Sequence, residues 1–439
     1  MIELPAAFMI QMKGILQDEY PAFEESLSRD RSTSIRLNPH KVIVDGSLDI
    51  AGPVPWCQGG FYLSTRPKFN EEPDFYTGSY YVQEASSMFL SYILTQIELP
   101  QDPILFDACA APGGKSLILQ DHLQSQGTLI ANEVIRSRAK ILHENLSKWG
   151  HSNHIITNSD LSRFSALHGH VDLLLIDAPC SGEGLFRKDS QASAHWSLEH
   201  VNHCALRQKR ILSDAVALLS EGAYLVYSTC TYNKTENEAQ VDWLQSEYGM
   251  KLVEKAVPNE WQISKTEGGY RFYPHLLRGE GLFMSVLRKP HKRDMDKPSH
   301  FSKSSRQPIS KSAYTIIQEY VNLTDPSAID TYQDDLILYT GKVNKDTLKS
   351  VRIYSYGRKL GRIMHKGFRP AAQLAQSIHL SDQIEKIALS EEEVLKLMNH
   401  EDIPTENVKK GWYLLTYSQN SVHFAKSHRR KHKIQFPKY

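Results

Sequence analysis

The stretch VDLLLIDAPCSGEGLFRKD, residues 171–189, decides how this chain is interpreted. Its first six residues form an apolar run of the kind found in strands that a parallel sheet buries on both faces. A second apolar run, AYLVY at residues 223–227, leads into STC. Each run therefore ends close to a cysteine, Cys180 or Cys230. Ligands of open α/β sheets bind outside the carboxyl ends of the strands, so we expect both thiols to face one crevice.

The two thiols allow several interpretations. The chain has only 5 cysteines, and a free cysteine most often packs as a small hydrophobe. There is no CxxC and no Cys/His set at ligand spacing, so we predict no metal site. Sparse cysteine and the lack of a secretory signal disfavour a disulfide. Two thiols at one crevice favour nucleophilic chemistry over packing.

Composition and charge place the chain in a broad class. It has 439 residues, 41% hydrophobic, and a net charge of +1, which suits two or three globular domains. No apolar run approaches the ~20 residues of a membrane span, and we predict a cytoplasmic protein without membrane contact. Residues 288–311 and 421–439 are basic, whereas 382–406 are acidic. Such segregation suits a basic face for nucleic acid, but a solvated linker and tail explain it equally well.

Four segments are distinguishable. Residues 1–75 open with a helical pattern and then a compact basic stretch. Residues 76–290 alternate strand-like and helix-like segments, which is typical of an α/β domain with a parallel sheet. Residues 291–312 are rich in Lys, Ser and Pro and predict a linker. Residues 313–439 mix short strands with one helix, and we expect the core to fold without them.

Two local patterns are specific enough to test. Residues 281–289, GLFMSVLRK, are typical of a strand, which we place at the edge of the main sheet. Residues 390–399 predict a helix, with Ser390 and Glu393 forming a capping box.

A glycine turn lies between a predicted strand and helix in DACAAPGGKS, residues 107–116. Gly113 and Gly114 allow close approach of the backbone to a ligand, and the helix start offers free N–H groups. The turn is not a P-loop, because Cys109 stands where that motif has glycine. It is not GxGxxG either, which disfavours a nicotinamide dehydrogenase.

Acidic residues follow three further strands of the predicted sheet. Glu133, after the second strand, suits the two hydroxyls of a ribose. Asp160, after the third, suits an adenine amino group, and Asp177, after the fourth, suits a positively charged centre. A nucleoside cofactor without phosphates meets all three requirements, and S-adenosylmethionine fits better than NAD.

Thiols and a sulfonium cofactor together predict a reaction. Carbon 5 of cytosine is a poor nucleophile until a thiolate adds to carbon 6, after which carbon 5 can accept a methyl group. A second group must then help to remove the hydrogen on carbon 5. Positive charge lowers a thiol pKa, and Lys115, Arg187 and Lys188 are the candidate cations.

These motifs resemble those of the Sun-family RNA (cytosine-5) methyltransferases, RsmF type, over roughly residues 30–290. The resemblance rests on six stretches: SIRLNPHK (34–41), YVQEASSM (81–88), DACAAPGGK (107–115), ANEV (131–134), DAPCSGEG (177–184) and STCT (228–231). In addition, GWYLLTYS at 411–418 resembles the family's PUA-like RNA-binding end.

The resemblance implies a fold and a domain plan. The fold class is α/β: a Rossmann-like S-adenosylmethionine-dependent methyltransferase core at 76–290. A small N-terminal α+β RNA-binding domain at 1–75 precedes it, and a C-terminal α+β, PUA-like RNA-binding region at 313–439 follows the linker.

The resemblance also implies residue roles. Cys230 would be the nucleophile and Cys180 would assist product release. The cofactor contacts would be Cys109, Ala110, Ala111, Pro112, Gly113, Gly114, Lys115, Glu133, Asp160 and Asp177.

The implied activity is methylation of cytosine carbon 5 in 16S ribosomal RNA. The expected partner is ribosomal RNA or the small ribosomal subunit, with no DNA, and we expect a monomer. A transfer RNA substrate is the nearest alternative. A catalytically inactive RNA-binding ribosome-assembly factor is disfavoured, because mere binding requires neither the two cysteines nor the three acids.

Overall fold

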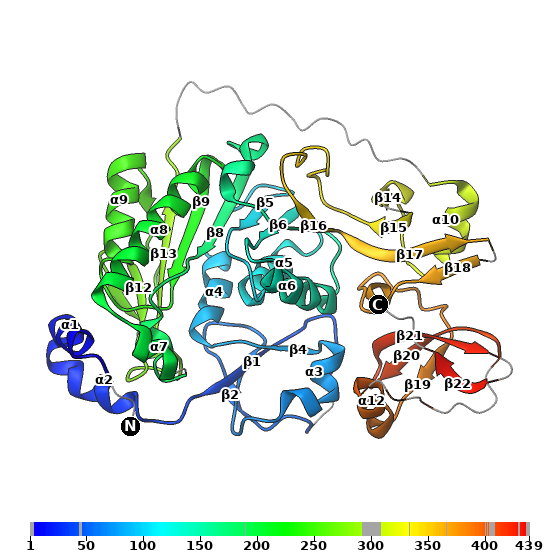
Figure 1. The fold of residues 1–439 in the computed structure, drawn as a ribbon, viewed down its shortest axis with the longest axis horizontal. Helices are drawn as coiled ribbons and strands as arrows, with labels where there is room; N and C mark the ends of the chain where they lie inside the picture. The colour runs from blue at the N-terminus through cyan, green and yellow to red at the C-terminus, as the bar shows by residue number, and fades with distance from the viewer. Residues whose placement is uncertain are drawn as a thin grey trace.

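The computed structural model describes residues 4–43, 46–188, 190–291, 309–332, 334–365, 367–399, 401, 403, 409–428 and 431–435. Most of the predicted linker, 291–312, lies outside these residues. None of the helices in the described part of the chain is long and apolar enough to span a membrane. Figure 1 shows the central sheet with the N-terminal segment below it and the C-terminal segment beside it.

A large mixed sheet forms the centre of the molecule, in the order β11-β12-β13-β9-β8-β5-β6-β7-β16 with β10 on β13. The five central strands, β9-β8-β5-β6-β7, are parallel. Its strands are β5 Ile104–Asp107, β6 Thr128–Asn132, β7 His154–Thr157, β8 Val171–Asp177, β9 Leu219–Thr229, β10 Lys251–Leu252, β11 Ser264–Thr266, β12 Gly269–Phe272, β13 Leu282–Arg288 and β16 Ile353–Tyr356. The predicted α/β core with a parallel sheet is confirmed.

Alternation of side chains along each strand produces two apolar faces. Leu105 and Leu129 pack on one face with α4, α5 and α6, whereas Phe106 and Ile130 pack on the other with α8 and α9. Successive strand residues point to opposite faces, so a strand buried on both sides is apolar throughout. The helices of the core are α4 Phe89–Thr95, α5 Gly114–Leu123, α6 Arg136–Trp149, α7 Ser190–His195, α8 Leu198–Val216 and α9 Glu238–Tyr248.

The chain reverses its order between β5 and β8. From β5 the sheet runs through β6 and β7 on one side and through β8 and β9 on the other. Ligands of such sheets bind outside the carboxyl ends of the strands at this switch point. Cys180 and the loop 107–116 both follow strands at this position.

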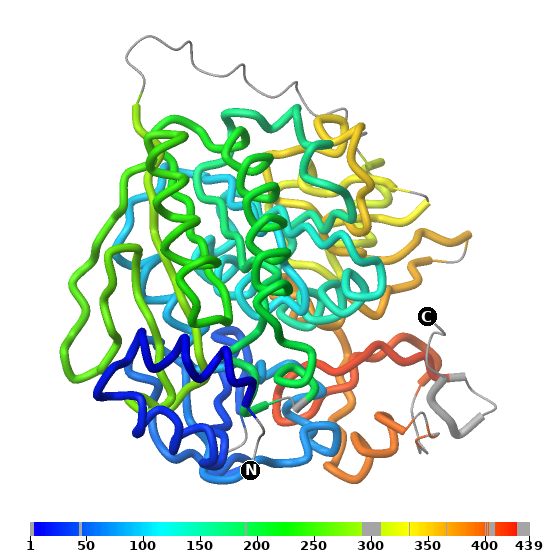
Figure 2. Tube along the Cα trace, turned by 60° about the vertical axis from the view of Figure 1, so that its left-hand side comes forward, coloured from blue at the N-terminus to red at the C-terminus, as the bar shows by residue number. Residues whose placement is uncertain are grey.

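The N-terminal segment covers that edge of the core. Its helices are α1 Ala6–Leu16, α2 Tyr20–Ser26 and α3 Pro73–Thr77, and its sheet has the order β2-β3-β1-β4: β1 Thr33–Leu37, β2 Ile50–Pro53, β3 Gly60–Leu63 and β4 Tyr80–Val82. This sheet extends past the predicted boundary at residue 75. Phe8 and Phe23 pack with Phe186, Trp196 and Tyr232, which flank the two cysteines in sequence. Figure 2 shows α1 and α2, in dark blue, against the lower end of the core.

The C-terminal segment contains two further small sheets, β14-β15-β17-β18 and β19-β20-β21-β22. Their elements are α10 Lys311–Gln318, β14 Ile329–Tyr332, β15 Asp335–Leu338, β17 Arg358–Met364, β18 Gly367–Pro370, α11 Ala372–Ala375, β19 Lys386–Ala388, α12 Glu391–Met398, β20 Gly411–Tyr417, β21 Asn420–His428 and β22 Lys431–Gln435. The predicted capping box of Ser390 and Glu393 is present at the start of α12.

Two expectations about the core differ from the structure. Residues 282–288 form β13, which is not an edge strand but lies between β9 and β12. Strand β16, from the C-terminal segment, pairs antiparallel with β7 and completes the central sheet. The core therefore shares its sheet with residues 313–439, which conflicts with the expectation that it folds without them. The pairing of β13 with β12 and that of β16 with β7 cannot be predicted from the local sequence pattern.

Two buried cations, one from the N-terminal segment and one from the C-terminal segment, bind the carboxyl end of the core helix α6. Arg358 donates to the carbonyls of Ser147 and His151, each at 3.1 Å. Lys41 donates to the carbonyl of Lys148 at 3.0 Å. Burial lowers the pKa of Lys41 well below its usual range and that of Arg358 to about 9. Helix C-termini carry partial negative charge and unpaired carbonyls, so these cations stabilise α6 from both flanking segments.

Candidate active site

The two cysteines come together at the carboxyl edge of the sheet. Cys180 follows β8, and Cys230 follows β9 directly. Their sulfur atoms lie 3.1 Å apart, and the Cys230 backbone N–H donates to the Cys180 sulfur at 3.3 Å. Both are free and only partly buried. The two thiols therefore lie together at the sheet edge where the sequence predicts a ligand-binding crevice.

The contact between the thiols affects the protonation of Cys180. The contact with Cys230, reinforced by burial, raises the pKa of Cys180 well above its usual range. Cys180 therefore keeps its proton at neutral pH and can donate it toward the Cys230 sulfur. A thiolate is the nucleophilic form of cysteine. Within the pair, Cys180 is the sulfur held in its neutral form.

Lys115 brings positive charge to the same place. Its ammonium nitrogen lies 2.8 Å from the Asp177 carboxylate, which also accepts the Ser228 hydroxyl at 2.7 Å. Burial lowers the pKa of Lys115, but the charges of Asp177 and Cys230 outweigh burial and leave it raised. Lys115 is therefore a stable cation that interacts electrostatically with the Cys230 sulfur. Of the three cations proposed from the sequence, Lys115 is the one that the structure brings to the thiols.

The other two candidate cations serve elsewhere. Arg187 pairs with Glu280 at 3.0 Å and donates to the carbonyl of Gly279. The side chain of Lys188 is exposed, and its carbonyl accepts from Arg31 at 3.4 Å. Proximity in sequence to Cys180 did not predict proximity in the structure, because the loop directs Arg187 toward Glu280 and leaves Lys188 exposed.

Two glutamates hold the cysteine loops to each other. Glu236, on the Cys230 loop, accepts the backbone N–H of Ser181 at 3.0 Å. Glu183, on the Cys180 loop, accepts the backbone N–H groups of Tyr232 and Asn233 at 2.7 and 2.9 Å. Each loop thus supplies the carboxylate that binds the backbone next to the other loop's cysteine.

The amide of Asn233 lies between these two carboxylates. It donates to Glu236 at 2.8 Å and to Glu183 at 3.1 Å. Gln208 adds a further donor to Glu236 at 2.7 Å. Both glutamates are buried, and burial raises the pKa of Glu236. Sequence reasoning missed these residues, although SGEG and TENE each place a glutamate a few positions after a cysteine.

The glycine turn forms a concave backbone between β5 and α5. Gly113 has φ of +120°, and a Cβ on Gly114 would lie 3.0 Å from the Tyr81 ring. Neighbouring side chains hold the turn: Arg138 donates to the carbonyl of Ala111 at 2.7 Å, and Asn145 to that of Pro112 at 2.8 Å. The turn leads directly into α5, where the free backbone N–H groups of a helix start can bind a ligand.

Asp107, the last residue of β5, has a free acceptor. One carboxylate oxygen accepts the Ser116 hydroxyl at 2.6 Å, whereas the other is buried without a partner among the described residues. Burial raises the pKa of Asp107 from 3.8 to about 7. Burial also raises the pKa of the nearby Cys109 thiol, with the charges of Asp107 and Asp177 adding to it. A buried polar atom without a partner beside the glycine turn is a position at which a polar ligand could bind.

The remaining strand-end acids lie on the same edge but differ in access. Glu133 is buried and accepts the backbone N–H of Ile135 at 2.9 Å, with Arg138 at 3.4 Å. Asp160 is exposed and pairs with Arg210 at 3.0 Å. Hydrogen bonds from Ser162 lower the pKa of Asp160. Both oxygens of Asp160 already have partners, so it is less available to a ligand than Asp107.

Comparison with known proteins identifies the family. Residues 94–288 match the family model of 16S rRNA methyltransferase RsmB/F, and residues 4–85 match that of the N-terminal domain of 16S rRNA methyltransferase RsmF. The ribosomal RNA small subunit methyltransferase F of Erwinia tasmaniensis is 31% identical over 99% of this chain and 96% of its own. The chain belongs to the RsmB/F methyltransferase family. The Vibrio vulnificus relative of the same name is 30% identical over 95% of this chain and 93% of its own.

Solved structures agree with this assignment. A methyltransferase homolog protein from Pyrococcus horikoshii has a TM-score of 0.56 and 26% identity, over 66% of this chain and 96% of its own. NSun6 from the same organism, solved with SFG, has a TM-score of 0.55 at 21% identity over 66% of this chain and 99% of its own. The RsmB/F core is thus a Rossmann-like methyltransferase fold, as predicted.

Proposed function

We propose that this RsmB/F protein methylates carbon 5 of a cytosine in small-subunit ribosomal RNA, using S-adenosylmethionine and a covalent cysteine–cytosine intermediate. The observation that carries the proposal is the pair of sulfurs 3.1 Å apart at the switch point of the sheet. A methyltransferase acting on oxygen or on an amino group needs no thiol. Addition to carbon 6 of a pyrimidine needs one, and its reversal needs a second polar group.

Cys230 is the proposed nucleophile. Its sulfur adds to carbon 6, which makes carbon 5 electron-rich. S-adenosylmethionine supplies the methyl group for carbon 5. Lys115 stabilises negative charge on Cys230 before addition. In the release step the carbon 5 proton passes to solvent as the bond between carbon 6 and sulfur breaks. Cys180 gives its proton to the departing Cys230 sulfur, which lies 3.1 Å away, and solvent then returns a proton to Cys180. The target base must leave any stack to reach this edge of the sheet.

The cofactor contacts are proposed on the residues that line the glycine turn. The free oxygen of Asp107, the start of α5 and the carboxylate of Glu133 face the same edge of the sheet. The turn residues proposed to contact it are Cys109, Ala110, Ala111, Pro112, Gly113, Gly114 and Lys115, with Asp160 and Asp177 as further acids. Asp177 is held between Lys115 and Ser228, so we expect it to act through these partners.

Incubation of the full chain with methyl-labelled S-adenosylmethionine and in-vitro transcribed 16S RNA tests the proposal. Digestion and mass spectrometry should find 5-methylcytosine in that RNA, at one or a few positions. Label in transfer RNA, and none in 16S RNA, would show that transfer RNA is the substrate. If neither RNA is labelled although the protein binds S-adenosylmethionine, the proposed reaction is wrong and the protein is an RNA-binding factor that does not catalyse it.

A further inference from the structure

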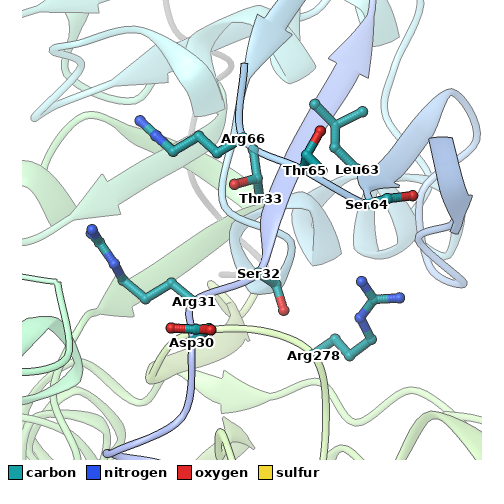
Figure 3. Close-up of a pocket in the computed structure, with 9 residues that line it drawn as sticks. All are labelled: Asp30, Arg31, Ser32, Thr33, Leu63, Ser64, Thr65, Arg66 and Arg278. Atoms are coloured by element: carbon teal, nitrogen blue, oxygen red, sulfur yellow. The ribbon is translucent and has the colours of Figure 1, made fainter. Parts of the chain in front are cut away.

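A polar pocket lies outside the cysteine site, between the N-terminal sheet and the loop that leads into β13. Its volume is about 300 Å³. Nine residues line it: Asp30, Arg31, Ser32, Thr33, Leu63, Ser64, Thr65, Arg66 and Arg278. In Figure 3, Arg31 and Arg66 point to one side and Arg278 stands on the other, with hydroxyl groups between them.

The pocket carries excess positive charge. The Arg278 guanidinium lies 4.4 Å from the Tyr62 ring centre, and that of Arg66 lies 5.2 Å from the Phe69 ring centre. Arg31 donates to the carbonyl of Lys188. These contacts orient the three guanidinium groups but neutralise none of them, and within the described part of the chain none forms an ion pair. Asp30 is the single acid among the lining residues.

The pocket walls are fixed to the loop that starts at Cys180. Arg187, on that loop, donates to the carbonyl of Ser26 at 3.4 Å and to that of Gly279 at 2.9 Å. Ser26 lies four residues before the lining segment that begins at Asp30. Gly279 directly follows the lining residue Arg278. A chain held in the pocket is therefore held in a defined position relative to the Cys180 loop.

We propose that this pocket binds a ribose-phosphate unit of a single-stranded segment of the substrate RNA, next to the base that reacts. One guanidinium group can donate two parallel hydrogen bonds to two oxygens of a phosphate, and the surrounding hydroxyl groups provide further donors. Asp30 adds a single acceptor among these donors, and a ribose 2′-hydroxyl can donate to its carboxylate. The inference rests on the proposed function, since it gives the RNA its path to Cys230.

The test compares full-length variants in binding a 12-nucleotide single-stranded RNA with one cytosine and its DNA counterpart. The triple variant Arg31→Ala, Arg66→Ala, Arg278→Ala should bind the RNA at least tenfold more weakly. Its salt slope should be shallower, because each phosphate contact in a single strand contributes about 0.7 to the slope. For methyl transfer, KM should rise while kcat stays near that of the unchanged protein.

Arg288→Ala is the matched control. Arg288 also lies over a tyrosine ring, Tyr224, at 5.3 Å, but near the start of β9 at the opposite edge of the sheet. This variant should bind RNA within twofold of the unchanged protein. S-adenosylmethionine affinity, measured in parallel, should be the same in all variants and shows that the fold is intact.

Asp30→Ala examines the ribose part of the proposal. It should weaken RNA binding more than DNA binding, and stronger RNA binding would overturn the ribose assignment. Triple-variant affinity within twofold, with an equal salt slope, would overturn the whole proposal. Loss of RNA affinity in the triple variant, with no methyl transfer by the unchanged protein, would uphold the pocket and reject the proposed reaction.

Discussion

Glu236 accepts the backbone N–H of Ser181 at 3.0 Å, so a residue of the Cys230 loop fixes the position of the residue after Cys180. In the opposite direction, Glu183, on the Cys180 loop, accepts the backbone N–H of Tyr232, which follows Cys230. Hydrogen bonds to a carboxylate are shorter and stronger than those between neutral groups, so these contacts hold the two loops together firmly. The pair therefore sets the separation of the two thiols.

Glu236→Gln should disturb this geometry with little loss of fold. An amide keeps the size but turns one acceptor into a donor that faces the N–H of Ser181 and the amide of Gln208, at a cost of about 1–3 kcal/mol. We expect kcat to fall at least tenfold with cofactor affinity within threefold of the original. Glu199→Gln, on the exposed first turn of α8, is the control and should leave kcat unchanged. Equal kcat in Glu236→Gln would reject its positioning role.

Glu133→Ala should weaken S-adenosylmethionine binding by about 1–3 kcal/mol, because a buried carboxylate that bonds the ligand is lost. Isothermal calorimetry measures this directly. Asp160→Ala should weaken it less, since Asp160 is exposed and already paired with Arg210. The reverse order of the two effects would require a different cofactor position.

Asp107 gives the fold a pH dependence with a definite sign. Its pKa is about 7 in the folded protein against 3.8 ordinarily, so the folded state binds more protons than the unfolded state between these values. Stability then falls as pH rises through that window. The variant Asp107→Asn has no carboxyl group at this position and should not lose stability in this way. The Tm of the variant minus the Tm of the original protein should therefore increase from pH 5 to pH 8. A Tm difference independent of pH would show that Asp107 is charged throughout.

Deleting residues 313–439 should destabilise the core or make it insoluble. The deletion exposes the edge of β7 that pairs with β16 and removes Arg358 from the end of α6. Unpaired strand edges promote association. Deleting 382–439 keeps both features, and the Tm should fall by less. A 1–312 fragment with the Tm of the full chain would contradict the role given to β16.

The sequence predicted the central part of this molecule well. Apolar runs bounded by turns placed β8 and β9. The two thiols could be predicted to meet because the carboxyl ends of parallel strands share an edge. Local patterns carry this information.

Other features depend on partners distant in sequence. The pairing of β16 with β7 joins residues about 200 positions apart, and no period in either strand specifies it. The ion pair of Arg187 with Glu280 and the contacts of Glu183 with the Cys230 loop likewise depend on the folded loops. Arg187 and Lys115 were both candidate cations for the thiols, and only Lys115, in the first turn of α5, interacts with the Cys230 sulfur.

Covalent trapping tests the central claim most directly. Cys180→Ala, incubated with S-adenosylmethionine and the RNA substrate, should accumulate a protein–RNA adduct through Cys230, seen as a slow band on a denaturing gel. Without Cys180 the cycle stops after methyl transfer, while Cys230→Ala and the double variant should give no band and less than about 1% of the original turnover. The same band from Cys230→Ala, and none from Cys180→Ala, would contradict the assignment of the nucleophile.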